Sequence, residues 1–122
     1  MSEIFRRGSI VVTSPETKPV VGQAYVVIQG DDAVESPMTI LVPLIRKVDI
    51  AVESDDPRIV KISRTESRLD VETVADCGFI ETLPKTEIDR QIGTAEPATL
   101  EALDEALRFS LGLRERPQAR FL

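Results

Sequence analysis

The chain has 122 residues, 42% of them hydrophobic and 30% charged, which is enough for one folded domain with a single core. It contains no histidine and a single cysteine, Cys77, so it offers no ligand set with suitable spacing for zinc and no internal disulfide. The formal net charge of −6 argues against non-specific nucleic-acid binding over the whole surface, but it leaves room for a local basic groove.

The sequence shows no membrane or export segment. Its longest apolar run, residues 39–45, is far shorter than the roughly 20 residues that span a bilayer. The N-terminus, MSEIFRRGS, has cations but no apolar stretch behind them, so we expect no signal peptide. One cysteine without a partner is typical of the cytoplasm. We therefore expect a cytoplasmic protein without metal or other cofactor.

Short β-branched runs separated by turn residues predict strands through the first two thirds of the chain. The predicted strands are residues 9–13, 24–29, 38–45, 58–63, 71–77 and 79–83. Two prolines and a glycine make residues 14–22 a loop, and residues 65–69 a turn or a single helical turn. Gly78 predicts a bulge or a tight bend between the last two strands.

The C-terminal third changes to a helical period. Pro97 at the first helical position and Gly112 after the last predict a helix over Pro97–Leu111. Four leucines share one face, and Asp104 and Arg108 are spaced as a supporting ion pair. The predicted fold is mostly β with α, a small curled sheet or barrel of about six strands capped by this helix. One domain covers residues 1–113, and residues 114–122 form a loose tail.

Residues 23–47 contain the candidate binding residues. Arg46 and Lys47 follow directly after an apolar strand, where they either keep a sheet edge soluble or hold a phosphodiester. Gln23 and Gln29 begin and end another strand, where each amide is either solvated or bonded to a base or a phosphate oxygen. The paired aspartates at 31–32 and 55–56 fit solvated turns better than a cation site.

Several segments, in order, resemble the MazF/PemK family of toxins from toxin–antitoxin systems. They are RRGSIVV, YVVIQGDD, TILVPL, FIETLPK, EIDRQIG and LDEALRFSLGL, which together span residues 6–113. No single segment is a strong motif, and the ordered set carries the resemblance. It implies an SH3-like barrel with a C-terminal helix and a homodimer. It further implies ribosome-independent cleavage of single-stranded RNA, and an acidic antitoxin as partner.

The chain departs from that family at two positions. An Arg-Pro pair commonly precedes the second strand, where this chain has Gln23 and Ala24, and a threonine commonly follows the third strand's apolar run, where it has Ile45. The family is held to use that arginine and threonine for catalysis, and neither role carries over. Glutamine has no charge to stabilise a phosphorane, and isoleucine has no hydroxyl.

Replacements are available nearby. We predict Arg46 and Thr39 as catalytic residues, Thr39 on the condition that the sheet orients it outward. Lys18, in the first loop, is predicted to bind RNA together with Gln23, Gln29 and Lys47.

Three functions remain open from the sequence. The first is a toxin that cleaves RNA without metal. The second is a binding module like the related toxin CcdB, which acts on a protein target. The third is a catalytically silent relative that sequesters an antitoxin.

Overall fold

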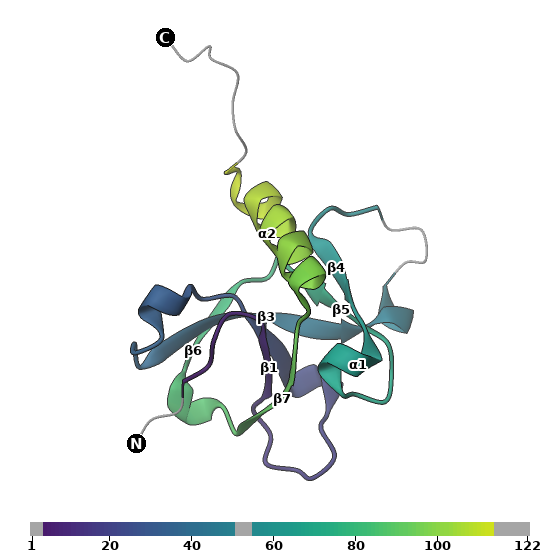
Figure 1. Cartoon of the computed structure of the whole chain (residues 1–122). Coiled ribbons are helices and arrows are strands. Elements are labelled where there is room, and N and C mark those ends of the chain that lie inside the picture. The colour runs from purple at the N-terminus through teal and green to yellow at the C-terminus, as the bar shows by residue number, and fades with distance from the viewer. Residues whose placement is uncertain (1–3, 51–54, 114–122) are drawn as a thin grey trace.

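The structure is a computed structural model that describes residues 4–50 and 55–113. Within these residues the chain forms an antiparallel sheet of seven strands and two helices (Figure 1). The strands are β1 (Ser9–Val12), β2 (Ala24–Val27), β3 (Met38–Arg46), β4 (Ile59–Ile62), β5 (Thr73–Asp76), β6 (Glu81–Pro84) and β7 (Arg90–Thr94). The helices are α1 (Arg64–Ser67) and α2 (Pro97–Leu111).

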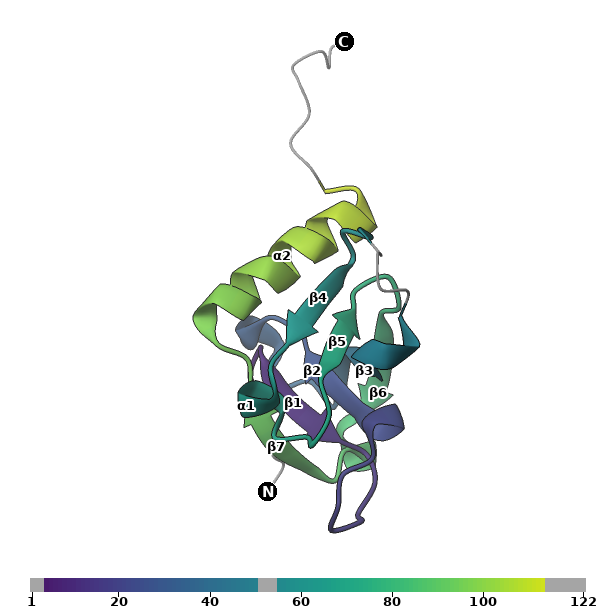
Figure 2. The ribbon, with the colours of Figure 1, turned by 90° about the vertical axis from the view of Figure 1, so that its right-hand side faces the viewer.

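The nine-residue strand β3 organises the sheet. Its first four residues pair with β6 on one side, its middle residues 41–43 pair with β2 on the other, and its last three residues pair with β5. The strand order is β4-β5-β3-β2-β1-β7, with β6 beside β3. The sheet therefore curves. Strands β4 and β5 form one part of it, separate from the part that contains β1 and β2 (Figures 1 and 2). This curvature places the end of β3 close to β4 and β5.

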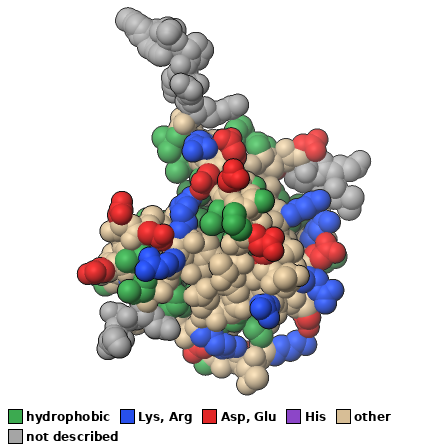
Figure 3. All heavy atoms as spheres, in the orientation of Figure 1, with side chains coloured by type: hydrophobic (Ala, Val, Ile, Leu, Met, Phe, Trp, Pro, Cys, Tyr) green, Lys and Arg blue, Asp and Glu red, His purple; other side chains and the backbone are tan. Residues whose placement is uncertain are grey.

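Charged side chains of both signs are spread over the face shown in Figure 3. No region of that face carries a single sign over a large area. No helix in the described part of the chain has the length and hydrophobicity that a membrane crossing would require.

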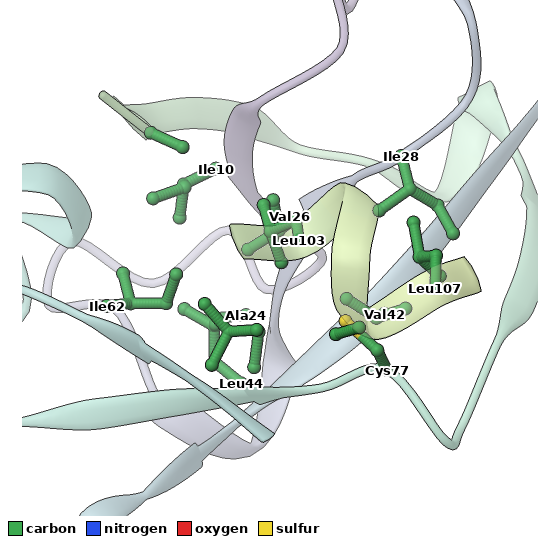
Figure 4. Close-up of a cluster of buried hydrophobic side chains, with 14 of the residues drawn as sticks. Ile10, Ala24, Val26, Ile28, Val42, Leu44, Ile62, Cys77, Leu103 and Leu107 are labelled. Carbon is green, nitrogen blue, oxygen red and sulfur yellow. The ribbon is translucent and has the colours of Figure 1, made fainter. Parts of the chain in front are cut away.

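The main core lies between the sheet and α2. Leu103 and Leu107 of α2 point toward Val26 and Val42 of the strands (Figure 4). Fully burying a side chain of this size stabilises the fold by about 1.5–3 kcal/mol. A second, smaller cluster on the other face of the sheet contains Phe5, Val11, Val27, Leu41 and Ile88. Because β1 and most of β2 are buried on both faces, their sequences are continuous apolar runs rather than alternating ones.

Helix α2 has the predicted bounds. Pro97 starts it, and Gly112 follows it in the left-handed conformation with φ 70°. The predicted apolar face is only partly correct, because Leu111 is 56% exposed where the last turn extends beyond the strands.

The predicted Asp104–Arg108 pair is wrong. Asp104 instead forms an ion pair with Arg7, which precedes β1, and Arg108 pairs with Glu105 at 3.0 Å. Arg7 comes from a different element and lies beside the middle of α2, so the long-range partner replaces the local one.

The six predicted strands are confirmed; four are shorter than predicted, while β3 and β6 each end one residue later than predicted. Strand β7 was not predicted because its sequence, RQIGT, has little β-branched or alternating character. It is held by its pairing with β1. The break at Gly78 is a turn, in which its N–H donates to Asp76 Oδ1 at 2.9 Å. The predicted tail at 114–122 lies outside the described residues.

The buried carboxylate of Glu66 joins α1 to the start of α2. One oxygen accepts hydrogen bonds from the N–H and Oγ of Ser63, both at 2.9 Å, and the other accepts from Glu96 N–H at 2.7 Å. Burial raises the pKa of Glu66, but the hydrogen bonds from Glu96, Thr99 and Ser63 outweigh it, so the pKa is lowered. The ionised carboxylate therefore caps both helices at once.

Candidate nucleic-acid interface

A groove of about 770 Å³ lies where β3 ends, beside β4, β5 and the turn after α1. We call it the basic groove, after the four cations that line it: Arg46, Lys47, Lys61 and Arg64. The carboxylates Asp56, Asp70 and Glu72 also line it, and its remaining surface is aliphatic, from Val48, Ile50, Ile59, Val71 and Val74. Figure 3 shows cations alternating with carboxylates along the side of the molecule where β3 ends. None of the described residues that line this groove is aromatic.

Regular strand geometry explains how these cations meet. Arg46, the last residue of β3, pairs with Thr73 of β5, and the N–H of Lys47 donates to the carbonyl of Glu72 at 2.9 Å. Lys61 is the outward residue of β4, between two buried neighbours. Arg64 opens α1 directly after its capping residue Ser63.

The cations of the basic groove fall into two kinds. Arg46 Nε lies 3.1 Å from Asp49 Oδ2, and Lys47 Nζ lies 3.4 Å from Glu72 Oε1. Within residues 4–50 and 55–113, Lys61 and Arg64 form no ion pair.

Each of the three carboxylates of the groove forms an ion pair with a lysine or an arginine. Glu72 is held by Lys47, and Asp70 Oδ2 lies 3.3 Å from Lys18 Nζ. Asp56 Oδ2 lies 2.8 Å from Arg58 Nη2, and hydrogen bonds from that guanidinium lower the pKa of Asp56 to about 2. The charges of the groove that lack an ion-pair partner among the described residues are therefore both positive.

Three of the predicted site residues come together here. Arg46 and Lys47 line the groove, and Lys18 reaches its edge through Asp70 although it belongs to the loop after β1. Gln23 is exposed in a 3₁₀ turn just before β2.

The other two predicted residues, Gln29 and Thr39, have buried side chains. The amide of Gln29 is buried, with Nε2 donating to Ala33 O at 2.8 Å and Oε1 accepting from Ile40 N–H at 3.2 Å, so it closes the loop between β2 and β3. Thr39 is 1% exposed, and its hydroxyl has no hydrogen-bond partner in the described structure. Strand β3 turns this side chain inward, so the condition attached to Thr39 is not met, and it leaves the candidate site.

The two positions marked by the family resemblance lie just before β2 and near the end of β3. Gln23 ends the 3₁₀ turn Val21–Gln23, and Ile45 pairs with Val74 of β5. Arg46 follows immediately.

Sequence reasoning missed Lys61 and Arg64. The alternation of residues 58–63 does place Lys61 outward, but only the pairing of β4 with β5 brings it to the end of β3. Cys77 is fully buried, and this burial raises its pKa to about 12, so the thiol is no nucleophile. The described residues hold no group of three or more Cys, Asp or Glu side chains placed for a metal ion.

Residues 6–111 match the family model described as a PemK-like, MazF-like toxin of type II toxin–antitoxin systems. The chain therefore belongs to this toxin family, as the ordered segments predicted. No curated protein matches it in sequence.

Solved structures support the same fold. An endoribonuclease in complex with its cognate antitoxin from a mycobacterial species is 19% identical, with a TM-score of 0.70 over 91% of this chain and 98% of that one. The Mycobacterium tuberculosis toxin MazF-mt6 is 18% identical, with a TM-score of 0.69 over 88% and 99%. A MazE–MazF complex from Deinococcus radiodurans is 13% identical, with a TM-score of 0.65 over 92% and 100%. The mostly β fold with a C-terminal helix is thus confirmed as MazF-like.

Proposed function

We propose that this toxin is an endoribonuclease that cleaves single-stranded RNA in the basic groove without a metal ion. The names of the solved relatives support an RNA-cleaving activity. The observation that carries the proposal is the groove itself. Four cations line it, Arg46, Lys47, Lys61 and Arg64, although the net charge of the whole protein is −6.

The two kinds of cation suit two tasks. Lys61 and Arg64, which form no ion pair among the described residues, bind the phosphates of the RNA backbone. Arg46 lies beside the positions that the family uses for catalysis, so its guanidinium stabilises the charge that develops on the reacting phosphate. The aliphatic floor contacts sugars and bases. Because no aromatic residue in the described part of the chain lines the groove, we expect RNA affinity to depend strongly on salt.

The first experiment tests cleavage. Pure protein with EDTA should cleave a varied pool of single-stranded RNA, and Arg46→Ala should lower the rate about 10²- to 10³-fold. Arg108→Ala is the matched control. Arg108 is equally exposed and also forms an i,i+3 ion pair, but on α2 and outside the basic groove. An intact RNA pool at high protein concentration would refute the enzymatic proposal.

The second experiment tests the phosphate-binding pair. Lys61→Ala and Arg64→Ala should each weaken RNA binding similarly for all sequences. Each should also reduce the slope of log affinity against log salt by about 0.7, the value for one phosphate contact on a single strand. Fluorescence anisotropy at several salt concentrations measures both quantities, again with Arg108→Ala as control. If the salt slope is unchanged in both variants, the RNA binds to another surface of the protein.

A second candidate function is a non-catalytic toxin relative. It is favoured by one observation, the uncharged residues Gln23 and Ile45 at the two positions that the family resemblance marks for catalysis. Under this alternative the protein leaves RNA intact but binds an antitoxin peptide or another protein target tightly. Growth arrest on expression that survives Arg46→Ala would support it.

We also infer that the toxin works as a homodimer in the cytoplasm and is held by a cognate acidic antitoxin. The resemblance to the family supports the dimer, and solved relatives crystallised with their antitoxins support the partner. Light scattering should give twice the chain mass of 13.5 kDa. A monomer at micromolar concentration would contradict the dimer.

A further inference from the structure

Arg90, at the start of β7, holds the loop that follows β1. Its Nη2 donates to the carbonyls of Glu16 at 2.8 Å and Thr17 at 3.2 Å, and its Nη1 reaches the carbonyl of Ser14 at 3.4 Å. The carboxylate of Asp89, 2.8 Å from Nη1, steadies the same guanidinium. One side chain of β7 thus binds three carbonyls of residues 13–20, which we call the 13–20 loop.

The loop has few means of ordering itself. Two of its residues are prolines, which have no N–H to donate, and it crosses between β1 and β2 without joining the sheet. A guanidinium suits the task because its five donors lie in one rigid plane and can bond several carbonyls together. A lysine in the same place would offer a single point charge.

The other end of the loop is fixed by the backbone. Thr13 N–H donates to Gln23 O at 3.0 Å, Gln23 N–H donates to Val20 O at 2.9 Å, and Val21 packs against the main core. Between Thr17, held by Arg90, and Val20 lies Lys18. Its ammonium lies 3.3 Å from Asp70, which lines the basic groove.

We propose that Arg90 is a positioning residue that fixes the 13–20 loop so that Lys18 stands at the edge of the basic groove and contacts an RNA phosphate. Arg90 itself does not touch RNA and acts only through the loop. This inference rests on the proposed function for its RNA contact, while the anchoring of the loop can be tested without RNA.

The first arm of the test measures the loop alone. Backbone ¹⁵N relaxation should give order parameters near the rigid value of about 0.85 for the amides of Glu16, Thr17 and Lys18. In Arg90→Ala and in Arg90→Lys they should fall below about 0.6, while the sheet amides keep their values. Unchanged order parameters in both variants would overturn the anchoring, whatever the protein does to RNA.

The second arm is a double-mutant cycle on RNA affinity, measured by anisotropy in the Arg46→Ala background to slow cleavage. Lys18→Ala and Arg90→Ala should each weaken binding about 3- to 10-fold, and the double variant should be no weaker than Lys18→Ala alone. Arg90→Lys should fail to restore affinity although it keeps the charge.

Two outcomes would overturn the positioning role. Additive losses, or rescue by Arg90→Lys, would mean that Arg90 contacts RNA directly. An unchanged affinity in a folded Arg90→Ala protein would mean that the loop is irrelevant to binding. If the parent protein binds no RNA, the proposed function fails, and the relaxation arm still decides whether Arg90 anchors the loop.

Discussion

At the scale of single residues, the basic groove is partly neutralised by its own carboxylates. Glu72 holds Lys47, Asp49 holds Arg46, and Asp70 holds Lys18. An RNA phosphate must displace these partners before it can use the same cations. Because exposed ion pairs contribute only about 0–1 kcal/mol each, the displacement is feasible but lowers affinity.

Removing one of these carboxylates should therefore strengthen RNA binding. We expect Glu72→Gln, which frees Lys47, to tighten binding about two- to fivefold, and less so at high salt. Anisotropy titrations at two salt concentrations measure the change. Glu105→Gln is the control, because it frees Arg108 on α2, outside the basic groove. Weaker RNA binding by Glu72→Gln than by the control would contradict this prediction, because it would mean that the Glu72 carboxylate favours RNA binding.

At the scale of elements, β7 passes unusually close to α1. A Cβ built on Gly93 would lie 1.9 Å from the carbonyl oxygen of Glu66, a backbone atom that cannot turn aside. Strand β7 could not approach α1 this closely with any other residue at this position. Glycine is required here because a side chain would collide with α1, and not because of the φ angle.

Gly93→Ala should destabilise the protein by about 1–3 kcal/mol or more, since β7 must shift away from α1. Gly30→Ala is the matched control, because a Cβ there meets nothing within 4 Å and the residue has φ −64°. That variant should stay within about 0.5 kcal/mol of the parent protein. Urea unfolding followed by circular dichroism compares the two, and equal midpoints would contradict the close contact.

At the scale of the whole molecule, Glu66 links the stability of the fold to pH. Its pKa is lowered below the ordinary value of 4.5 in the folded protein, so the folded state binds this proton less readily than the unfolded chain. The stabilisation is present in full above pH of about 5 and is lost as the pH falls through the folded-state pKa.

Glu66→Gln should lower the free energy of unfolding by about 1–3 kcal/mol at pH 7, because an amide cannot accept all three hydrogen bonds. The gap between the variant and the parent protein should narrow as the pH falls below about 4. Glu105→Gln is the control, since the carboxylate of Glu105 is exposed on α2. A gap that stays constant between pH 7 and pH 3 would exclude the ionised carboxylate as the cause.

Local patterns predicted most of the fold. Pro97 and Gly112 marked both ends of α2, and β-branched runs located six strands, because these preferences act within a few residues. Strand β7 escaped prediction since its conformation comes from pairing with β1, more than 75 residues earlier in the chain. Its polar sequence carries no strand preference of its own.

The candidate site was less accessible from the sequence. Arg46 and Lys47 were found because they end an apolar run. Lys61 and Arg64 were missed, since only the chain's path from β3 through β4 and back to β5 brings them there. The burial of Gln29 and Thr39 could not be predicted, for a related reason. The sequence pattern predicts that a polar residue near a strand end is exposed. Whether it is buried depends on which neighbouring segment covers it.

The pairing of β1 with β7 has a consequence for how the protein is made. During synthesis β1 leaves the ribosome long before its partner β7, so one edge of β1 stays open until β7 emerges. Contacts between such distant segments slow folding, to milliseconds or longer in small β-rich domains. An open apolar edge invites pairing with other chains during that time. The chain is thus most prone to aggregate before β7 pairs with β1.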